Sequence, residues 1–368
     1  MNDKILLDFS RVGAVDTIGE LKECKDPLVV FGAGLMAELV MDALRKHDIH
    51  YGAVCVDGWN NGSHETENIY GWDEINNKYD TYSVIIAHAP DPERIESLKK
   101  NEKIHKIYFF HSYDIKLFDA DTVATHMDKY QQIFDLLEDM YSRKCLVAFL
   151  NTKISGDMQY IFEVFKEKMT CFVNPVWSIT ENESFWDIGA YTGNLIQEFI
   201  TVSKGKYHQV VALEPDKESF QTLDLSFGRQ NRIFTFNYGA WSEKGYHAFV
   251  TDIGHKLCVK CAMEDETGSN QLACISLDEL LEESPQLSNP TLLRFNYGTG
   301  VVEALRGAAK ILKTSQPKLA ISIGFDEIGF VNIIHEIRKH NPNYKFYIRF
   351  QRCIASAINL YALVPSQD

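Results

Sequence analysis

A glycine turn between two apolar strands is the feature that most constrains how this chain can fold. Residues 185–194 read Phe-Trp-Asp-Ile-Gly-Ala-Tyr-Thr-Gly-Asn, and a second apolar segment follows that ends at Glu214. The pattern predicts a strand ending at Asp187, a turn built on Gly189 and Gly193, a helix and a second strand. Such glycines let the backbone approach a ligand, and an acid at the second strand tip can accept the hydroxyls of a ribose. The layout is typical of a nucleoside-binding α/β unit.

The spacing of this turn differs from the dinucleotide pattern. It lacks the Gly-x-Gly-x-x-Gly rhythm and places Asp187 before the first glycine. A carboxylate there suits the positively charged methionine end of S-adenosylmethionine (SAM), which has no pyrophosphate to cradle. The spacing therefore favours a SAM site, and the alternative is a strand-turn-helix unit that binds no ligand.

From about Met140 to the C-terminus the chain resembles the FkbM-type SAM-dependent methyltransferases. The segments that carry the resemblance are Asp187-Ile-Gly-Ala-Tyr-Thr-Gly, Ala212-Leu-Glu-Pro-Asp216, Asn237-Tyr-Gly-Ala-Trp241, Ile275-Ser-Leu-Asp-Glu-Leu280, Glu303-Ala-Leu-Arg-Gly-Ala308 and Pro317-Lys-Leu-Ala320. The resemblance implies a Rossmann-like methyltransferase fold and methyl transfer from SAM, usually to a hydroxyl of a sugar or secondary metabolite.

The resemblance also implies which residues contact the cofactor. The wall around methionine and ribose would be Asp187, Gly189, Ala190 and Gly193, with Tyr191 and Asn194 at its rim. Glu214 would hold the ribose hydroxyls. Asn237 and Ala240 are candidates for the adenine edge, and the alternative for Asn237 is that it only satisfies backbone groups.

On the acceptor side the chain departs from the family. The family usually reads Lys-Met-Asp-Ile-Glu-Gly-Ala-Glu, whereas residues 294–301 read Arg-Phe-Asn-Tyr-Gly-Thr-Gly-Val, so Asn296, Gly298 and Val301 replace the three acids. After the next strand, where a histidine is frequent in the family, the chain reads Gly324-Phe-Asp-Glu327. Carboxylates at the end of the earlier strand can bind a metal or take a proton from a hydroxyl, and Asn296, Gly298 and Val301 can do neither.

Three interpretations of this loss stay open. The chain is a methyltransferase whose base comes from elsewhere, with Asp326, Glu327, Tyr297 or His255 as candidates. Methyl transfer needs mainly in-line positioning, so a displaced base is compatible with catalysis. Alternatively, the chain is a non-catalytic module that binds SAM or a nucleotide-sugar, or it catalyses another transfer at the same site.

Composition narrows the cellular context and the partners. The 368 residues carry a formal net charge of −14, which argues against a nucleic-acid partner and favours a small-molecule or sugar acceptor. Neither a signal peptide nor an apolar run long enough to span or insert into a membrane is evident, so we expect a cytoplasmic protein. A homo-oligomer is compatible with the sequence.

The eight cysteines are scattered and indicate reduced core residues. Cys258 and Cys261 form the one close pair, which is compatible with half of a zinc site or a redox pair. Without a second such pair, and with His255 alone nearby, we expect no metal.

An earlier block, residues 27–112, has a glycine turn of its own. Strands are predicted at 28–31, 51–57, 83–87 and 107–110, so that a small parallel sheet forms. Gly32, Gly34 and Ala37 make a Gly-x-Gly-x-x-Ala turn, and Asp57 ends the second strand. This is a nucleotide-binding signature, which by analogy suggests a nucleotide-sugar or carrier role, and the alternative is tight packing of strand on helix.

The predicted fold class is α/β with two Rossmann-like domains. The first spans residues 1–118, a helical connector spans 119–172, and the methyltransferase-like domain spans 173–368. In the last domain we expect seven strands, the final one antiparallel, at 184–187, 209–213, 233–237, 291–296, 318–323, 346–349 and 359–364. Residues 246–275 interrupt the alternation and predict a hairpin insertion.

Overall fold

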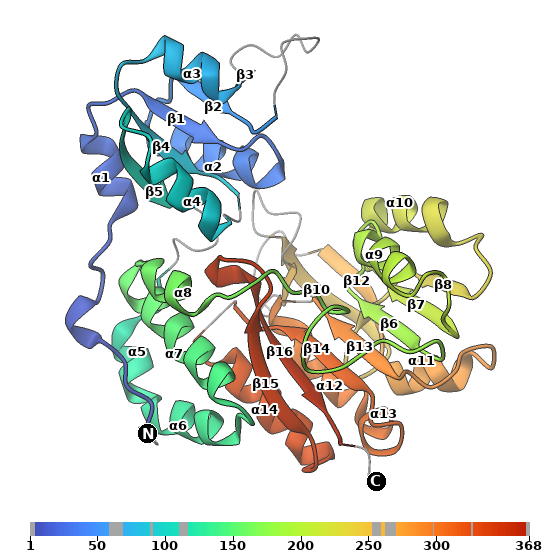
Figure 1. The fold of residues 1–368 in the computed structure, drawn as a ribbon. Coiled ribbons are helices and arrows are strands. Elements are labelled where there is room, and N and C mark those ends of the chain that lie inside the picture. The colour runs from blue at the N-terminus through green and yellow to red at the C-terminus, as the bar shows by residue number, and fades with distance from the viewer. Residues whose placement is uncertain are drawn as a thin grey trace.

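The computed structural model describes residues 4–58, 69–88, 91–109, 117–251, 259–261, 270–296, 298–324 and 327–365. Two open sheets with helices on both faces are joined by a helical block, and a smaller mixed sheet lies beside the second of them (Figure 1). This arrangement confirms the predicted α/β class. No helix within the described ranges is long and apolar enough to cross a bilayer.

The first sheet has five strands, all paired in parallel, in the order β3-β2-β1-β4-β5. The strands are β1 (Leu28–Phe31), β2 (Ala53–Cys55), β3 (Ile69–Tyr70), β4 (Tyr82–Ile86) and β5 (Ile104–Phe109). The helices are α1 (Thr17–Glu23), α2 (Leu35–Lys46), α3 (Trp72–Lys78) and α4 (Pro92–Lys99). The two-residue β3 is the one strand of this sheet that the sequence did not predict.

Alternate residues of the first sheet face opposite layers. Val30, Val54 and Ile85 pack with α1 and α2 in one buried cluster, whereas Phe31 and Val84 pack with α3 and α4 in another. Both faces are therefore covered, as expected for strands that read as continuous apolar runs.

The helical block connects the two sheets. It comprises α5 (Ala120–Thr125), α6 (Met127–Leu136), α7 (Met140–Ser155) and α8 (Gln159–Val164). Asp119 and Asp139 cap the amino ends of α5 and α7 by accepting backbone N–H groups, and Gly156 ends α7 in the left-handed conformation. Most of α7 is buried, because it packs against α8 and against the second sheet.

The second sheet has the order β15-β16-β14-β13-β6-β7-β8. Its strands are β6 (Ser184–Ile188), β7 (Gln209–Leu213), β8 (Ile233–Phe236), β13 (Leu292–Phe295), β14 (Lys318–Ser322), β15 (Lys345–Phe350) and β16 (Ile358–Leu363). β16 runs antiparallel to both of its neighbours. The seven predicted strands and the antiparallel last strand are thus confirmed.

Helices cover the second sheet on both faces. One face packs α9 (Asn194–Val202) and α10 (Lys217–Phe227). The other packs α6, α7, α11 (Leu277–Glu283), α12 (Val301–Arg306), α13 (Ala309–Thr314) and α14 (Gly329–His340). Short 3-10 turns are η1 (Phe9–Arg11), η2 (Gly298–Gly300) and η3 (Ala355–Ala357).

The predicted insertion forms part of a third sheet with the order β11-β10-β12-β9. Its strands are β9 (Gly239–Ala240), β10 (Gly245–Thr251), β11 (Val259–Cys261) and β12 (Asn270–Ile275). β10 pairs antiparallel with both β11 and β12, whereas β9 joins β12 in parallel. The antiparallel hairpin is therefore confirmed.

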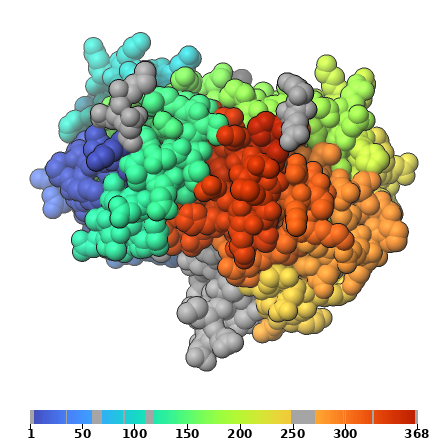
Figure 2. Space-filling view, turned by 90° about the horizontal axis from the view of Figure 1, so that it is seen from below, coloured from blue at the N-terminus to red at the C-terminus, as the bar shows by residue number. Residues whose placement is uncertain are grey.

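The N-terminal segment does not start in the first sheet. It runs along α7, where the Asp8 N–H donates to Asn151 Oδ1 at 2.8 Å and the Gly13 and Val15 N–H groups donate to the carbonyls of Ile154 and Ser155. Figure 2 shows the blue N-terminal residues beside the green helical block. The chain thus crosses between the helical block and the first sheet twice.

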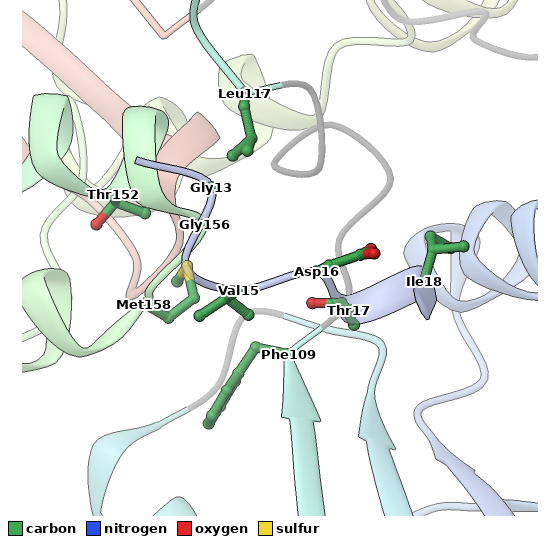
Figure 3. A pocket seen from close by; sticks show the side chains of 10 residues that line it. All are labelled: Gly13, Val15, Asp16, Thr17, Ile18, Phe109, Leu117, Thr152, Gly156 and Met158. Carbon is green, nitrogen blue, oxygen red and sulfur yellow. The ribbon is translucent and has the colours of Figure 1, made fainter. Parts of the chain in front are cut away.

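A cavity of about 170 Å³ lies where the chain crosses. The first crossing, residues 13–18, lines one side of it, and Phe109, Leu117, Thr152, Gly156 and Met158 line the rest (Figure 3). None of the predicted cofactor residues lines this cavity.

Candidate functional site

The turn after β6 has an unusual backbone. Gly189, Tyr191 and Gly193 all have positive φ, of 80°, 53° and 90°. The N–H groups of Gly189 and Ala190 both donate to the Leu213 carbonyl, at 2.9 and 3.0 Å. These bonds fold the turn across the carboxyl end of β7. Tyr191 lies within the turn, in a backbone conformation that residues other than glycine rarely adopt.

Gly193 is required by sterics as well as by its φ. A Cβ atom there would lie 2.4 Å from Phe227 Cε2 and 2.9 Å from Leu223 Cδ1. The missing side chain thus lets α9, which begins at the exposed Asn194, pack against α10. This close approach fixes the turn over the strand ends.

Asp187 lies at the carboxyl end of β6 and is fully buried. Its Oδ1 accepts a hydrogen bond from Arg294 Nη1 at 3.0 Å, and its Oδ2 has no partner among the residues that the structure describes. Burial raises the pKa of Asp187, and the positive charge of Arg294 opposes that rise. A buried, unpaired carboxylate oxygen is costly, so its presence indicates a site for a hydrogen-bond donor.

Arg294 is the functional residue that the sequence analysis left without a role. It lies directly opposite Asp187 in the register of β13 and β6, and 18% of its side chain is exposed. A cation and an acid on predicted strands could have suggested a pair. However, which two strands are neighbours depends on the order of the sheet, which local patterns do not give.

Glu214 follows β7 and is buried, with 6% of its surface exposed. Its Oε2 accepts the Tyr191 N–H at 2.7 Å, and its Oε1 accepts the Asp216 N–H at 2.9 Å. Burial raises the pKa of Glu214 to about 7, although these two hydrogen bonds act to lower it. The structure therefore brings the second predicted carboxylate against the same turn as Asp187.

Asn237 and Ala240 follow β8. Asn237 Nδ2 donates to the carbonyls of Glu214 and Pro215, at 2.8 and 3.1 Å, so its amide satisfies backbone groups. Ala240 is completely buried in β9, where it pairs with Ile275. Asn237 thus ties β8 to the Glu214 loop, and a contact of either residue with adenine stays a prediction.

The acceptor side is only partly described. The Asn296 N–H donates to the Ile188 carbonyl at 3.0 Å, and Val301, buried, begins α12. Glu327 Oε1 accepts the Asp119 N–H at 3.3 Å, so this candidate base faces the amino end of α5. The other candidates, Tyr297, Asp326 and His255, lie outside the described residues, as does Cys258. Within the described ranges no three His, Cys, Asp or Glu side chains could hold a metal ion.

The predicted turn of the first domain has two different glycines. Gly32 has a φ of 129°, and a Cβ there would lie 3.3 Å from the Ala87 carbonyl oxygen and 3.6 Å from Ala37 Cβ. Gly34 is the N-cap of α2, and a Cβ there would meet no atom of the described residues within 4 Å. Gly32 therefore serves close packing, whereas Gly34 faces open space.

Comparison with known proteins depends on structure, since no protein-family model and no curated protein matches the sequence. The crystal structure of methyltransferase FkbM from Methylobacillus flagellatus KT matches with a TM-score of 0.63 at 18% identity, over 96% of this chain and 95% of that one. The chain has the fold of this methyltransferase.

Weaker structural matches cover about half of the chain. Aeropyrum pernix fibrillarin in complex with S-adenosyl-L-methionine matches over 51% of this chain and 70% of its own, with a TM-score of 0.34 and 9% identity. Precorrin-6y C5,15-methyltransferase from Geobacter metallireducens GS-15 matches over 51% and 82%, with a TM-score of 0.32 and 10% identity. At these scores neither adds to the fold assignment.

Proposed function

We propose that this protein is a SAM-dependent methyltransferase that methylates a hydroxyl of a sugar or another small hydroxylated metabolite. The observation that carries the proposal is the buried, unpaired Oδ2 of Asp187 beside Glu214 at the turn of a methyltransferase-type fold. A nucleoside with a cationic amino-acid end is the ligand that fits two carboxylates on neighbouring strands.

The residues present fit SAM at three points. Asp187 Oδ2 would accept a hydrogen bond from the methionine ammonium, whose charge would also compensate the buried carboxylate. Glu214, held in place by two backbone N–H groups, would accept the ribose hydroxyls. The glycines of the turn would leave room for the methionine backbone. When bound, SAM would supply a methyl group on a sulfonium, which is transferred without metal or redox chemistry.

The chain's own contribution to transfer is mainly positioning. Arg294 fixes the Asp187 carboxylate, and the Glu214 contacts fix the turn, so the cofactor would be held in one orientation. The base that takes the acceptor proton is proposed among Asp326, Glu327, Tyr297 and His255. The strongly acidic chain favours a neutral acceptor such as a sugar over a polyanion.

The loss of the acidic acceptor motif favours a second candidate function. Asn296, Gly298 and Val301 stand where three acids are usual, and Val301 is buried rather than directed to an acceptor. A chain that keeps the cofactor carboxylates and lacks these acids would bind SAM without turnover, as a sensor or scaffold.

Calorimetric titration with SAM and S-adenosylhomocysteine tests the proposal. We expect micromolar binding that Asp187→Asn and Glu214→Gln each abolish. Asp57→Asn is the matched control, because it removes a carboxylate at the corresponding strand end of the first sheet. No binding to the wild-type chain would overturn both candidate functions. Binding without methyl transfer from radiolabelled SAM to a panel of sugars would favour the second candidate over the first.

A further inference from the structure

The carboxyl edge of the first sheet has a second set of functional groups. β1 has β2 on one side and β4 on the other, so the connections that follow β1 and β4 leave the sheet on opposite sides. In open parallel sheets, ligands bind in the crevice that forms at such a point. Phe31 ends β1 and precedes the Gly32–Gly34 turn, and His88 follows β4.

Arg94 is the central side chain of this edge. Its Nη2 lies 2.6 Å from Asp57 Oδ1, which also accepts a hydrogen bond from Trp72 Nε1 at 2.7 Å. The guanidinium lies over the rings of Trp72 and Phe31, 5.1 and 5.6 Å from their centres. Because α4 supplies Arg94 and α3 supplies Trp72, these contacts hold a cation rigidly at the ends of β1 and β2.

Two further cationic or titratable groups converge on the same edge. His88 Nδ1 lies 3.0 Å from the Phe31 carbonyl oxygen. The His88 and Phe31 rings are nearly perpendicular, and their centres are 4.5 Å apart. The bond to Nδ1 leaves His88 Nε2 without a partner among the described residues. Lys168, exposed in the loop before β6, lies near enough that its charge and that of Arg94 help burial to lower the pKa of His88.

The amino end of α2 opens toward solvent beside these groups. Gly34 caps the helix without any side-chain hydrogen bond, and no atom lies within 4 Å of where its Cβ would be. The first N–H groups of a helix lack internal acceptors and carry partial positive charge. In a chain with a formal net charge of −14, this edge therefore combines the side-chain nitrogens of Arg94 and His88 with a helix amino end.

We propose that this edge binds a nucleoside phosphate. The phosphate would lie at the amino end of α2, close to Arg94 and His88, and a ribose hydroxyl would donate to the second oxygen of Asp57. The site is separate from the proposed SAM site, since it uses a different sheet and cations in place of buried carboxylates. If this edge had only a structural role, the contacts among Arg94, Asp57 and Trp72 would suffice, and the amino end of α2 would not have to face solvent.

Titration of the full chain with UDP, ADP and inorganic pyrophosphate tests this proposal by calorimetry. Gly34→Asp puts a carboxylate at the proposed phosphate position, and Gly34→Asn has the same size without the charge. Both are good helix caps at an ordinary φ, so both variants should fold, which thermal unfolding checks. We expect Gly34→Asp to weaken nucleotide binding at least about tenfold and Gly34→Asn to change it less than about threefold.

The alternatives each have a distinct outcome. No binding of UDP or ADP by the wild-type chain would overturn the proposal, as would equal binding by wild type and Gly34→Asp. Equal loss in both Gly34 variants would contradict the phosphate placement. Binding of pyrophosphate as tight as that of UDP and ADP would contradict a nucleoside ligand. Asp187→Asn should keep nucleotide binding, and if it loses that binding while Gly34→Asp retains it, the nucleotide occupies the SAM turn instead.

Discussion

The two glycine turns of this protein have the same place in their sheets but opposite electrostatics. The turn after β6 has two buried carboxylates, Asp187 and Glu214, at neighbouring strand ends. The turn after β1 has the guanidinium of Arg94 and the imidazole of His88 near it, and the carboxylate of Asp57 there is paired and exposed. Similar backbone layouts can therefore favour ligands of opposite charge, and the side chains at the strand tips determine which.

Replacing the arginine of each Arg–Asp pair gives the largest expected difference in stability between the two regions. Arg294→Gln would leave the buried Asp187 carboxylate without its cation, and we expect it to reduce the free energy of unfolding by about 3–5 kcal/mol. Arg94→Gln breaks a pair whose Asp57 side chain is 56% exposed, so we expect about 1 kcal/mol or less. Urea unfolding at pH 8 measures both.

The Arg294→Gln loss should shrink at pH 5. The pKa of Asp187 is raised in the folded chain, so its protonated form, which needs no cation, becomes accessible as the pH falls. Equal losses for the two arginine variants would show that the pairs are equivalent and would contradict the comparison.

Replacing one glycine in each turn by alanine gives the next largest expected difference in stability. Gly193→Ala places a Cβ against Phe227 and Leu223 at a φ of 90°, and we expect a loss of about 2–4 kcal/mol. Gly34→Ala has open space and an ordinary φ, so we expect a change within about 0.5 kcal/mol. Thermal unfolding of both variants compares them, and a loss for Gly34→Ala as large as that for Gly193→Ala would contradict the open space at Gly34.

The pH dependence of SAM affinity sharpens the role of Glu214. Its ionised form accepts ribose hydroxyls best, and its pKa is about 7, so affinity should be full above pH 7 and fall, by at most about tenfold per unit, below it. Stability responds in the opposite sense. Because the unfolded pKa is 4.5, the contribution of Glu214 to stability is present below that pH and lost as the pH rises through about 7. Calorimetry from pH 5.5 to 8.5 measures the change in SAM affinity, and an affinity that is the same at every pH would contradict this role of Glu214.

The smallest expected effect concerns Asn237. Asn237→Ala removes its bonds to the Glu214 and Pro215 carbonyls, and we expect a loss of about 1 kcal/mol in stability. SAM affinity should change less than about threefold if the amide serves only the backbone. A tenfold weaker affinity at unchanged stability would instead support contact with adenine.

The sequence predicted individual helices and strands better than it predicted which of them lie side by side. The strands around Asp187 and Glu214 were predicted because buried parallel strands read as short apolar runs between turns. The Asp187–Arg294 pair was missed because 107 residues separate its members, and the strand order that makes them neighbours is a property of the whole sheet. The edge strand β3 was missed because two residues carry no periodic signal.

The side-chain partners at each turn depend on the same long-range packing. The glycines indicated where the turns lie, since some backbone conformations are open only to a residue without a side chain. However, the sequence did not show that Gly32 serves packing while Gly34 is open, because the nearest atoms come from β4 and α2. Likewise, Asp57 could be placed at a strand end, but its cation, Arg94, comes from a helix 37 residues away.

The contact between the N-terminal segment and α7 sets an order for folding during synthesis. Asp8 and Asn151 are 143 residues apart, so the segment around Asp8 leaves the ribosome well before α7 and acquires these partners only later. The first sheet, whose elements all lie between Thr17 and Phe109, can form in the meantime. The segments that lead into and out of that sheet both bond to α7, through Val15 to Ser155 and Phe118 to Lys153. A truncation that starts the chain after Phe109 would therefore expose part of α7 as well as remove the first sheet.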